Sequence, residues 1–153
     1  MPFTLTIVAA GKKKADLDEE VQRYVSLMRP WASVSIVTVK SPEGDATQSE
    51  KRAREAKLLQ AKWPEGSYPI ALSEEGRLMT SAHFSQWLEG LRPRRCITFT
   101  IGGAYGLSPQ LKEQCKEIIS LSPLTLPHKL CMVVLVEQIY RAFTIFYHHP
   151  YHK

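Results

Sequence analysis

The sequence predicts an α/β domain built around a mainly parallel β-sheet. Short runs of apolar and β-branched residues alternate along the chain with amphipathic runs of helical period, which is the pattern of a parallel sheet covered by helices. The chain has 153 residues, of which 44% are hydrophobic and 23% charged, ordinary values for one globular domain. We therefore expect residues 1–153 to form a single domain with helices on both faces of the sheet.

Strands are predicted where short runs combine apolar character with β-branched residues. Four segments meet this description: residues 4–9, 33–40, 68–72 and 96–101. A fifth segment, 121–126, is a short strand or an irregular segment, because prolines interrupt it. A turn is expected at Glu75 and Gly76, and a glycine-rich turn follows the strand that ends at Ile101.

Capping residues predict where several helices begin. Asp16 and Glu19 have the spacing of a capping box, and the helix they open should end before Pro30. Thr47 and Glu50 have the same spacing and should open a helix that runs to about residue 62. Further helices are expected over 81–91, 109–119 and 130–147.

The helix expected over 47–62 concentrates positive charge. The whole chain has a formal net charge of +5 and a pI of about 9.2, which suits a polyanionic partner. This helix carries Lys51, Arg52, Arg54, Lys57 and Lys62. One interpretation is a solvated face with acidic partners at Glu50 and Glu55, and the other is an edge that faces RNA.

The long helix expected over 130–147 carries an unusual charge in an apolar setting. Glu137 and Arg141 have the i, i+4 spacing of an ion pair. The helix also has many apolar residues that one core cannot obviously absorb, which suggests an interface between subunits. These residues are Leu130, Val133, Val134, Tyr140 and Phe143.

Cysteine usage and the chain ends point to the cytoplasm. Cys96, Cys115 and Cys131 form no CxxC pair, so they are expected to be free thiols in a reducing compartment. The apolar run near the amino terminus precedes its lysines, unlike a signal peptide, and no apolar run reaches the ~20 residues that span a bilayer.

His148, His149 and His152 lie together, but no carboxylate or cysteine is near them in sequence, so no metal site is expected.

Two loops are placed to hold a ligand, because parallel sheets bind ligands at the carboxyl ends of their strands. The first has the sequence IGGAYGL over residues 101–107, and its glycines let a ligand approach the main chain. The second is SPLTLPH over 122–128, whose prolines fix the backbone around small and apolar side chains that could surround an adenine. The composition of the first loop would also suit a plain tight turn without a ligand. The composition of the second would also suit a buried irregular segment without a ligand.

Together these motifs resemble the RlmH family. The resemblance rests on IGGAYGLSP, then LSPLTLPH, then VLVEQIYRAFTI and a terminal HPYHK, and it extends in length and element order over the whole chain. It implies a SPOUT methyltransferase fold with a trefoil knot near the carboxyl terminus, S-adenosylmethionine as cofactor and a homodimer. It also implies methylation of N3 of a pseudouridine in the large-subunit (23S) rRNA, on the assembled ribosome.

The resemblance assigns site residues by position. Leu72 and Gly103 should touch the cofactor, and the loop around it should consist of Ser122, Pro123, Leu124, Thr125, Leu126 and Pro127. The tail Tyr151-His152-Lys153 should close over the site, with Arg141 near the cofactor or the RNA. At Ala104 and Tyr105 the family often has asparagine or another polar residue, which leaves the substrate contacts of that turn open.

Transfer of a methyl group to N3 of a uracil-type base requires the loss of a proton. We hypothesise that His152 assists this deprotonation while Tyr151 positions the base. The alternative is that the tail is a frayed end without a role. Two other classes remain open: an RNA-binding module that contacts phosphate through the basic helix, and an enzyme acting on a small nucleotide.

Overall fold

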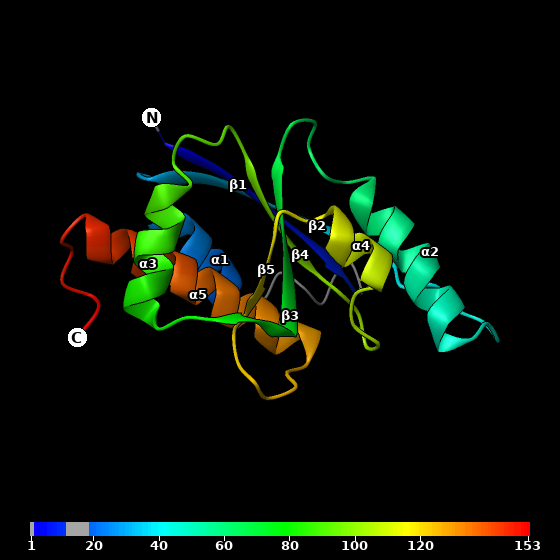
Figure 1. Ribbon diagram of the computed structural model, residues 1–153. Helices are drawn as coiled ribbons and strands as arrows, with labels where there is room; N and C mark the ends of the chain where they lie inside the picture. The colour runs from blue at the N-terminus through cyan, green and yellow to red at the C-terminus, as the bar shows by residue number, and fades with distance from the viewer. Residues whose placement is uncertain (1, 12–18) are drawn as a thin grey trace.

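The protein folds around a five-stranded sheet in which every neighbouring pair of strands is parallel. The computed structural model describes residues 2–11 and 19–153. Across the sheet the strand order is β2-β1-β4-β3-β5, visible in Figure 1. The strands are β1 (Phe3–Ala10), β2 (Ala32–Val39), β3 (Tyr68–Leu78), β4 (Ile97–Ile101) and β5 (Glu117–Ser120). The predicted α/β class with a parallel sheet is thus confirmed.

Helices cover both faces of this sheet (Figure 1). They are α1 (Glu19–Leu27), α2 (Gln48–Gln60), α3 (Ser81–Gly90), α4 (Pro109–Gln114) and α5 (His128–Phe146). α1 and α3 pack against α5 on one face, and α2 and α4 lie together on the other. The predicted cap at Thr47 is confirmed, since its hydroxyl accepts the Glu50 N–H at 3.2 Å. The predicted cap at Asp16 lies outside the described residues.

Side chains along β1 alternate between two separate hydrophobic cores, one on each face of the sheet. Leu5 and Ile7 point into the larger core under α1, α3 and α5, whereas Val8 and Ala10 point into the smaller core under α2 and α4. The larger core includes Phe143, whose ring meets that of Phe3 edge-on with 5.2 Å between centroids. A strand buried on both faces is typical of a parallel sheet.

The expectation that α5 exposes its apolar residues is only partly right. Tyr140 and Phe143 are buried inside the same chain, where Tyr140 packs on Tyr24 and Trp31. Leu130, by contrast, has 46% of its surface exposed. The apolar surface left for another contact is therefore near the amino end of α5 and not along its whole length.

The helix predicted over 109–119 is wrong beyond Gln114. Leu111, Ile118 and Ile119 have helical spacing, but the chain turns after α4 and forms the edge strand β5. Backbone pairing with β3 decides the outcome, beginning where Lys116 N–H donates to the Pro69 carbonyl at 2.8 Å. β-Branched isoleucines suit that strand, so tertiary pairing overrides the helical period.

The turn predicted at Glu75 and Gly76 is also wrong, because β3 continues through it to Leu78. Its pairing with β5 shifts register between Leu72 and Arg77, which both lie opposite Ile119. A Cβ on Gly76 would lie 2.6 Å from the Ile119 carbonyl carbon. Gly76 is therefore required by the close approach of two backbones and not by a turn.

Candidate cofactor pocket and carboxyl-terminal cluster

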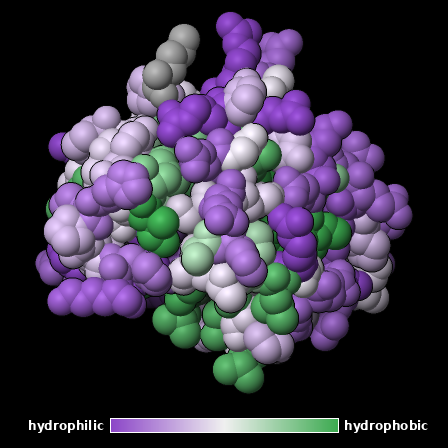
Figure 2. All heavy atoms as spheres, turned by 60° about the vertical axis from the view of Figure 1, so that its left-hand side comes forward, coloured by the Kyte–Doolittle hydropathy of each residue, from purple (hydrophilic) through white to green (hydrophobic). Residues whose placement is uncertain are grey.

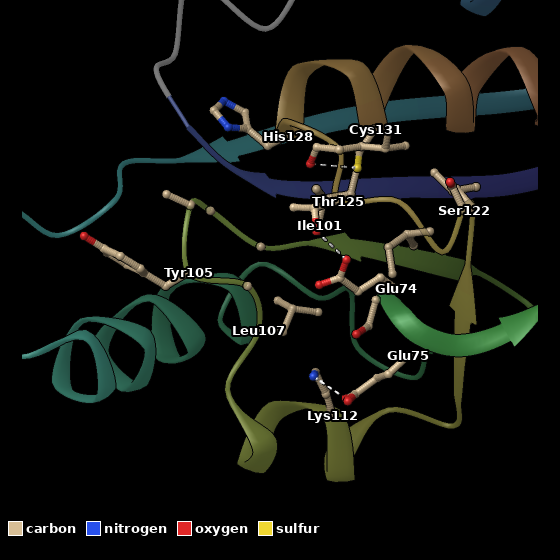
Figure 3. A pocket seen from close by; sticks show the side chains of 18 of the residues that line it. Glu74, Glu75, Ile101, Tyr105, Leu107, Lys112, Ser122, Thr125, His128 and Cys131 are labelled. Atoms are coloured by element: carbon tan, nitrogen blue, oxygen red, sulfur yellow. Dashed lines mark hydrogen bonds and ion pairs between the residues drawn. The ribbon is translucent and has the colours of Figure 1, made fainter.

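A pocket of about 390 Å³ opens where β4 and β5 end, beside the middle of β3, and its volume lies in the usual range of small-molecule sites. Figure 3 shows side chains from several segments surrounding it. Its walls come from β3 and β4, the turn after β4, the loop after β5, and residues of α2, α4 and α5. The lining residues are Arg52, Leu72, Ser73, Glu74, Glu75, Ile101–Leu107, Lys112, Leu121, Ser122, Leu124, Thr125, Leu126, His128 and Cys131.

The glycine turn after β4 is hydrogen-bonded to a buried carboxylate of α2. The Gly103 N–H donates to Oε1 of Glu55 at 3.0 Å, and Glu55 is only 7% exposed. The Gly103 carbonyl accepts the Gly106 N–H at 3.0 Å, and Gly106 has φ of +76°. A Cβ on Gly102 would lie 2.8 Å from the Gly106 carbonyl carbon, so this tight turn requires glycine at 102 and favours it at 106.

The loop after β5 is fixed by hydrogen bonds to its own backbone. The Ser120 hydroxyl donates to the Ser122 carbonyl at 2.8 Å, and the Ser122 hydroxyl accepts the Leu124 N–H at 3.0 Å. The Thr125 hydroxyl donates to the carboxylate of Glu74 at 2.7 Å and so ties this loop to β3 (Figure 3). The wall opposite the glycine turn is therefore pre-organised.

Most of the ionic groups in the pocket are paired. Lys112 donates to Glu75 with 2.5 Å between Nζ and Oε1, and this hydrogen bond holds the pKa of the Glu75 carboxyl below its usual value. Glu74 accepts from Thr125. Arg52 differs, because its buried Nε has no acceptor among the residues that the structure describes.

Six of the eight cofactor residues expected from the sequence line this pocket: Leu72, Gly103, Ser122, Leu124, Thr125 and Leu126. Pro123 and Pro127 belong to the same loop but are not among the lining residues. Pro127 instead precedes the first residue of α5 as its N-cap. The two loops singled out from the sequence thus meet around one cavity.

The expected catalytic residues form a second cluster at the other end of α5. Arg141 donates to Oε1 of Glu137 through Nη2 at 2.6 Å and through Nε at 2.9 Å, which confirms the predicted ion pair. The Tyr151 hydroxyl donates to the same oxygen at 3.0 Å. Nδ1 of His152 lies 3.0 Å from Nη1 of Arg141. The tail is therefore docked on α5, with the Tyr151 ring 4.7 Å from that of Tyr140.

Protonation in this cluster follows from its contacts. Burial raises the pKa of the Tyr151 hydroxyl, and hydrogen bonds with Tyr24 and Glu137 raise it further. The hydrogen bond to Glu137 likewise raises the pKa of Arg141. Near neutral pH Tyr151 is thus a hydrogen-bond donor and Arg141 a fixed cation.

Within one chain the cluster lies far from the pocket. Cys131, in the first turn of α5, lines the pocket, and Arg141 is ten residues further along the helix. At the helical rise this separation is roughly 15 Å. The structure therefore brings Tyr151, His152 and Arg141 together, but it does not bring them to the predicted cofactor residues of the same chain.

Comparison with known proteins assigns the family. A family model described as a predicted SPOUT methyltransferase matches residues 3–152. The ribosomal RNA large subunit methyltransferase H of Polynucleobacter asymbioticus is 42% identical over 151 residues, covering 97% of this chain and 98% of its own. The protein of the same name from Listeria monocytogenes is 39% identical over 159 residues, covering 99% of this chain and all of its own. The chain belongs to the SPOUT methyltransferase family.

The fold agrees with this SPOUT assignment. A probable methylase family protein from Haemophilus influenzae superimposes with a TM-score of 0.59 over 97% of this chain and 70% of that one, at 14% sequence identity. Within residues 2–11 and 19–153 no helix has the length and apolar character needed to cross a bilayer. The same part of the chain holds no group of three or more His, Cys, Asp or Glu side chains that could hold a metal ion.

Sequence reasoning did not find several residues of this SPOUT pocket. One of the two interpretations of the basic helix places Glu55 on a solvated face, but Glu55 is buried and faces Gly103. Arg52 precedes Glu55 by three residues and so lies on the same side of α2, a spacing that could have identified it. Glu74, Glu75 and Lys112 gave no comparable signal, because only the extension of β3 brings the two glutamates to the cavity.

Proposed function

We propose that this protein transfers a methyl group from S-adenosylmethionine to N3 of a pseudouridine in large-subunit (23S) rRNA, on assembled ribosomes in the cytoplasm. The main support for the proposal is that the glycine turn and the loop 121–127 line the same cavity. These are the segments from which the family resemblance was recognised. The names of the relatives, ribosomal RNA large subunit methyltransferase H, support the class of substrate.

The pocket residues fit S-adenosylmethionine. Apolar walls at Leu72, Ile101 and Leu126 suit the adenine ring, and main-chain groups of the two loops are available to its polar edge. The carboxylate of Glu74, which accepts from Thr125 and has no ion pair in the described part of the chain, provides negative charge suited to a cationic ligand. When bound, this cofactor supplies an activated methyl group, and the protein has to orient the acceptor and to remove its proton.

The carboxyl-terminal cluster supports a site completed by a second chain. Tyr151, His152 and Arg141 lie roughly 15 Å along α5 from the pocket of their own chain, so they do not close over it from this position. A homodimer that brings the tail of one chain to the pocket of the other would join the two parts. Exposed leucines near the pocket could form part of the interface: Leu78, Leu124 and Leu130, with 56%, 70% and 46% of their surfaces exposed.

The surface agrees with an interface in this region. Figure 2 shows hydrophobic residues gathered at the lower edge of a mainly hydrophilic face. That edge is at the height at which the loop between β5 and α5 lies in Figure 1. Contiguous exposed apolar surface of this kind is typical of a contact with another protein. The knot implied by the family resemblance is part of this proposal as well.

In the proposed reaction the tail handles the proton and the charge of the target base. His152 accepts the N3 proton on its imidazole, the side chain that most often serves as a general base. Tyr151, which stays protonated, exchanges its acceptor Glu137 for a carbonyl oxygen of the base on which negative charge develops. Arg141, which stays charged, binds a backbone phosphate of the RNA.

Two measurements together test the proposal against the other classes of function. Calorimetric titration with S-adenosylmethionine should show binding, whereas an RNA-binding module without a cofactor would show none. Transfer of labelled methyl groups should be strong with ribosomes that lack the modification, and weak with protein-free rRNA. Cofactor binding combined with transfer to a free nucleotide, and not to ribosomes, would indicate a small-molecule enzyme instead.

A further inference from the structure

Two side chains of the pocket wall have no partner within the described part of the chain. Arg52 comes from α2, and its Nε is buried without an acceptor. Tyr105 comes from the glycine turn, makes no ring contact, and has 47% of its surface exposed. In Figure 3 the Tyr105 ring lies on the opposite side of the pocket from Ser122. Both residues are thus available to a ligand at one side of the cavity.

An unpaired guanidinium nitrogen requires an explanation. Buried polar atoms in folded proteins are nearly always hydrogen-bonded, and an arginine can only donate. The carboxylates near this cavity do not serve as its acceptor. Glu75 pairs with Lys112, Glu74 accepts from Thr125, and Glu55 accepts from Gly103. The Arg52 guanidinium thus lines the pocket without a hydrogen-bond or ion-pair partner in the described part of the chain, and its outer nitrogens are left for an acceptor brought by a ligand.

The surroundings of Arg52 favour a polyanion as that ligand. The acidic residue three positions later, Glu55, is turned inward and buried, so it does not neutralise the outer face of α2. Exposed or half-exposed cations occupy the solvent side of the same helix: Lys51, Arg54 and Lys57. These cations raise the positive potential around this end of the pocket and attract a polyanion, while Arg52, on the inner side of α2, is the one that lines the cavity.

Tyr105 adds an aromatic surface beside the cation. An exposed tyrosine ring with no aromatic neighbour is a suitable platform for stacking of an unpaired base. It projects from the turn whose backbone is fixed by Glu55 and by the bond between Gly103 and Gly106. The ring is thus carried on a rigid support at the entrance of the pocket.

We propose that Arg52 and Tyr105 form the nucleotide-binding rim of the pocket, where Arg52 donates to a phosphate of the substrate RNA and Tyr105 stacks on one of its bases. The inference rests on the proposed function, because it requires an RNA substrate. It extends that function by assigning recognition of the strand to residues outside both the cofactor loops and the carboxyl-terminal tail. The competing acceptor for Arg52 is the carboxylate of the cofactor itself.

Steady-state kinetics of methyl transfer to ribosomes separates these possibilities. We would compare the wild-type protein with Arg52→Met, Arg52→Lys, Tyr105→Ala and Tyr105→Phe, measuring the cofactor Kd by calorimetry and the Tm for each. Arg95→Met is the matched control, because Arg95 is exposed and precedes β4, at the end of the sheet away from the pocket. If Arg52→Met does not fold, Arg52→Lys provides the test, since lysine cannot replace the Nε donor.

The inference predicts that Arg52→Met and Tyr105→Ala each raise the KM for ribosomes roughly tenfold. This size is expected for the loss of one phosphate contact or one stacked base. The cofactor Kd should change less than about twofold in both variants. Arg52→Met should also reduce by about one the slope of log(kcat/KM) against log salt. Tyr105→Phe and Arg95→Met should behave like the wild type.

Three results would overturn the inference. A weaker cofactor Kd for Arg52→Met would assign the guanidinium to the cofactor. Unchanged KM values in both rim variants, with an active wild type, would remove the rim while leaving the proposed function intact. No transfer by the wild-type protein would refute the proposed function and this inference with it.

Discussion

The main-chain N–H of Gly103 donates to the buried carboxylate of Glu55, 3.0 Å away, and so connects the glycine turn to the middle of α2. The contact joins residues 48 positions apart and fixes one wall of the candidate cofactor pocket. Its consequences for binding and stability can be measured directly.

Replacing Glu55 by alanine should weaken both the turn and the fold. The substitution leaves the half-buried N–H of Gly103 without its acceptor, which costs about 1 kcal/mol of the free energy of unfolding. The cofactor Kd should rise by roughly tenfold, because the turn is no longer held in place. Chemical denaturation and calorimetry check the two effects. Glu89→Ala, at an exposed position on α3, is the control, and equal behaviour of the two variants would show that the contact contributes nothing.

Alanine at Gly102 should abolish cofactor binding. The new Cβ would lie 2.8 Å from the carbonyl carbon of Gly106, so the backbone of the turn would have to move. At Gly103 the nearest atom is Oε2 of the Glu55 side chain, at 2.7 Å, which can rotate away more easily. Gly103→Ala should therefore be the milder variant in calorimetry.

The control for both glycines is Gly90→Ala. Gly90 ends α3, and a Cβ there would meet nothing within 4 Å. Its replacement should leave cofactor binding unchanged and raise the free energy of unfolding by up to about 1 kcal/mol, because alanine favours the helix. Normal cofactor binding by Gly102→Ala would contradict the assignment of the turn to the cofactor.

Removal of residues 151–153 should abolish methyl transfer and leave the cofactor Kd unchanged. The reason is that no tail residue lines the pocket, and in the proposed dimer the tail acts on the acceptor base and its proton and not on the cofactor. The fold should persist with a modest loss of stability, because Tyr151 packs against Tyr140. Circular dichroism, calorimetry and labelled methyl transfer measure the three properties, and full turnover by the truncated chain would exclude a catalytic role of the tail.

Mixed dimers test whether the site is shared between chains. Co-expression of Gly102→Ala and the chain lacking 151–153, with two different affinity tags, allows the mixed dimer to be purified. One of its two sites would then combine an intact pocket with an intact tail from the other chain, so we expect about half of the wild-type activity from two inactive parents. An inactive mixed dimer would show that each chain uses its own tail.

The thiol of Cys115 should react slowly with alkylating agents at neutral pH. Burial raises its pKa from 9.0 to about 11, so the reactive thiolate appears only as the pH rises through that value. At pH 8 the thiolate fraction is about a hundredfold lower than for an unperturbed thiol. Peptide mapping after iodoacetamide treatment should show a rate that still increases at pH 10. A plateau below pH 9.5 would contradict the assigned burial.

The order of strands and helices could be predicted from the sequence where local signals agree with the tertiary structure. The cap at Thr47 and the strand at 97–101 are such cases. The prediction failed at β5, where Ile118 and Ile119 fit a helix by spacing and a strand by residue type. Pairing with β3 decides between the two, and a single sequence contains no direct signal for that contact.

The candidate site, like the fold, could be predicted only in part from the sequence. The glycine turn and the loop 121–127 were recognisable because glycines and prolines constrain the backbone locally. Glu55 and Arg52 were not, because their roles depend on which face of α2 meets the turn after β4. The distance between the tail and the pocket also emerges only from the structure, since it is set by the length of α5.

The most direct test of the central claim is to locate the transferred methyl group. The purified protein is incubated with labelled S-adenosylmethionine and ribosomes that lack the modification, and the digested rRNA is analysed by mass spectrometry. The account predicts label at N3 of a single pseudouridine in the large-subunit rRNA, and none with the Gly102→Ala variant. Label on another type of nucleotide, or on no rRNA despite tight cofactor binding, would contradict it.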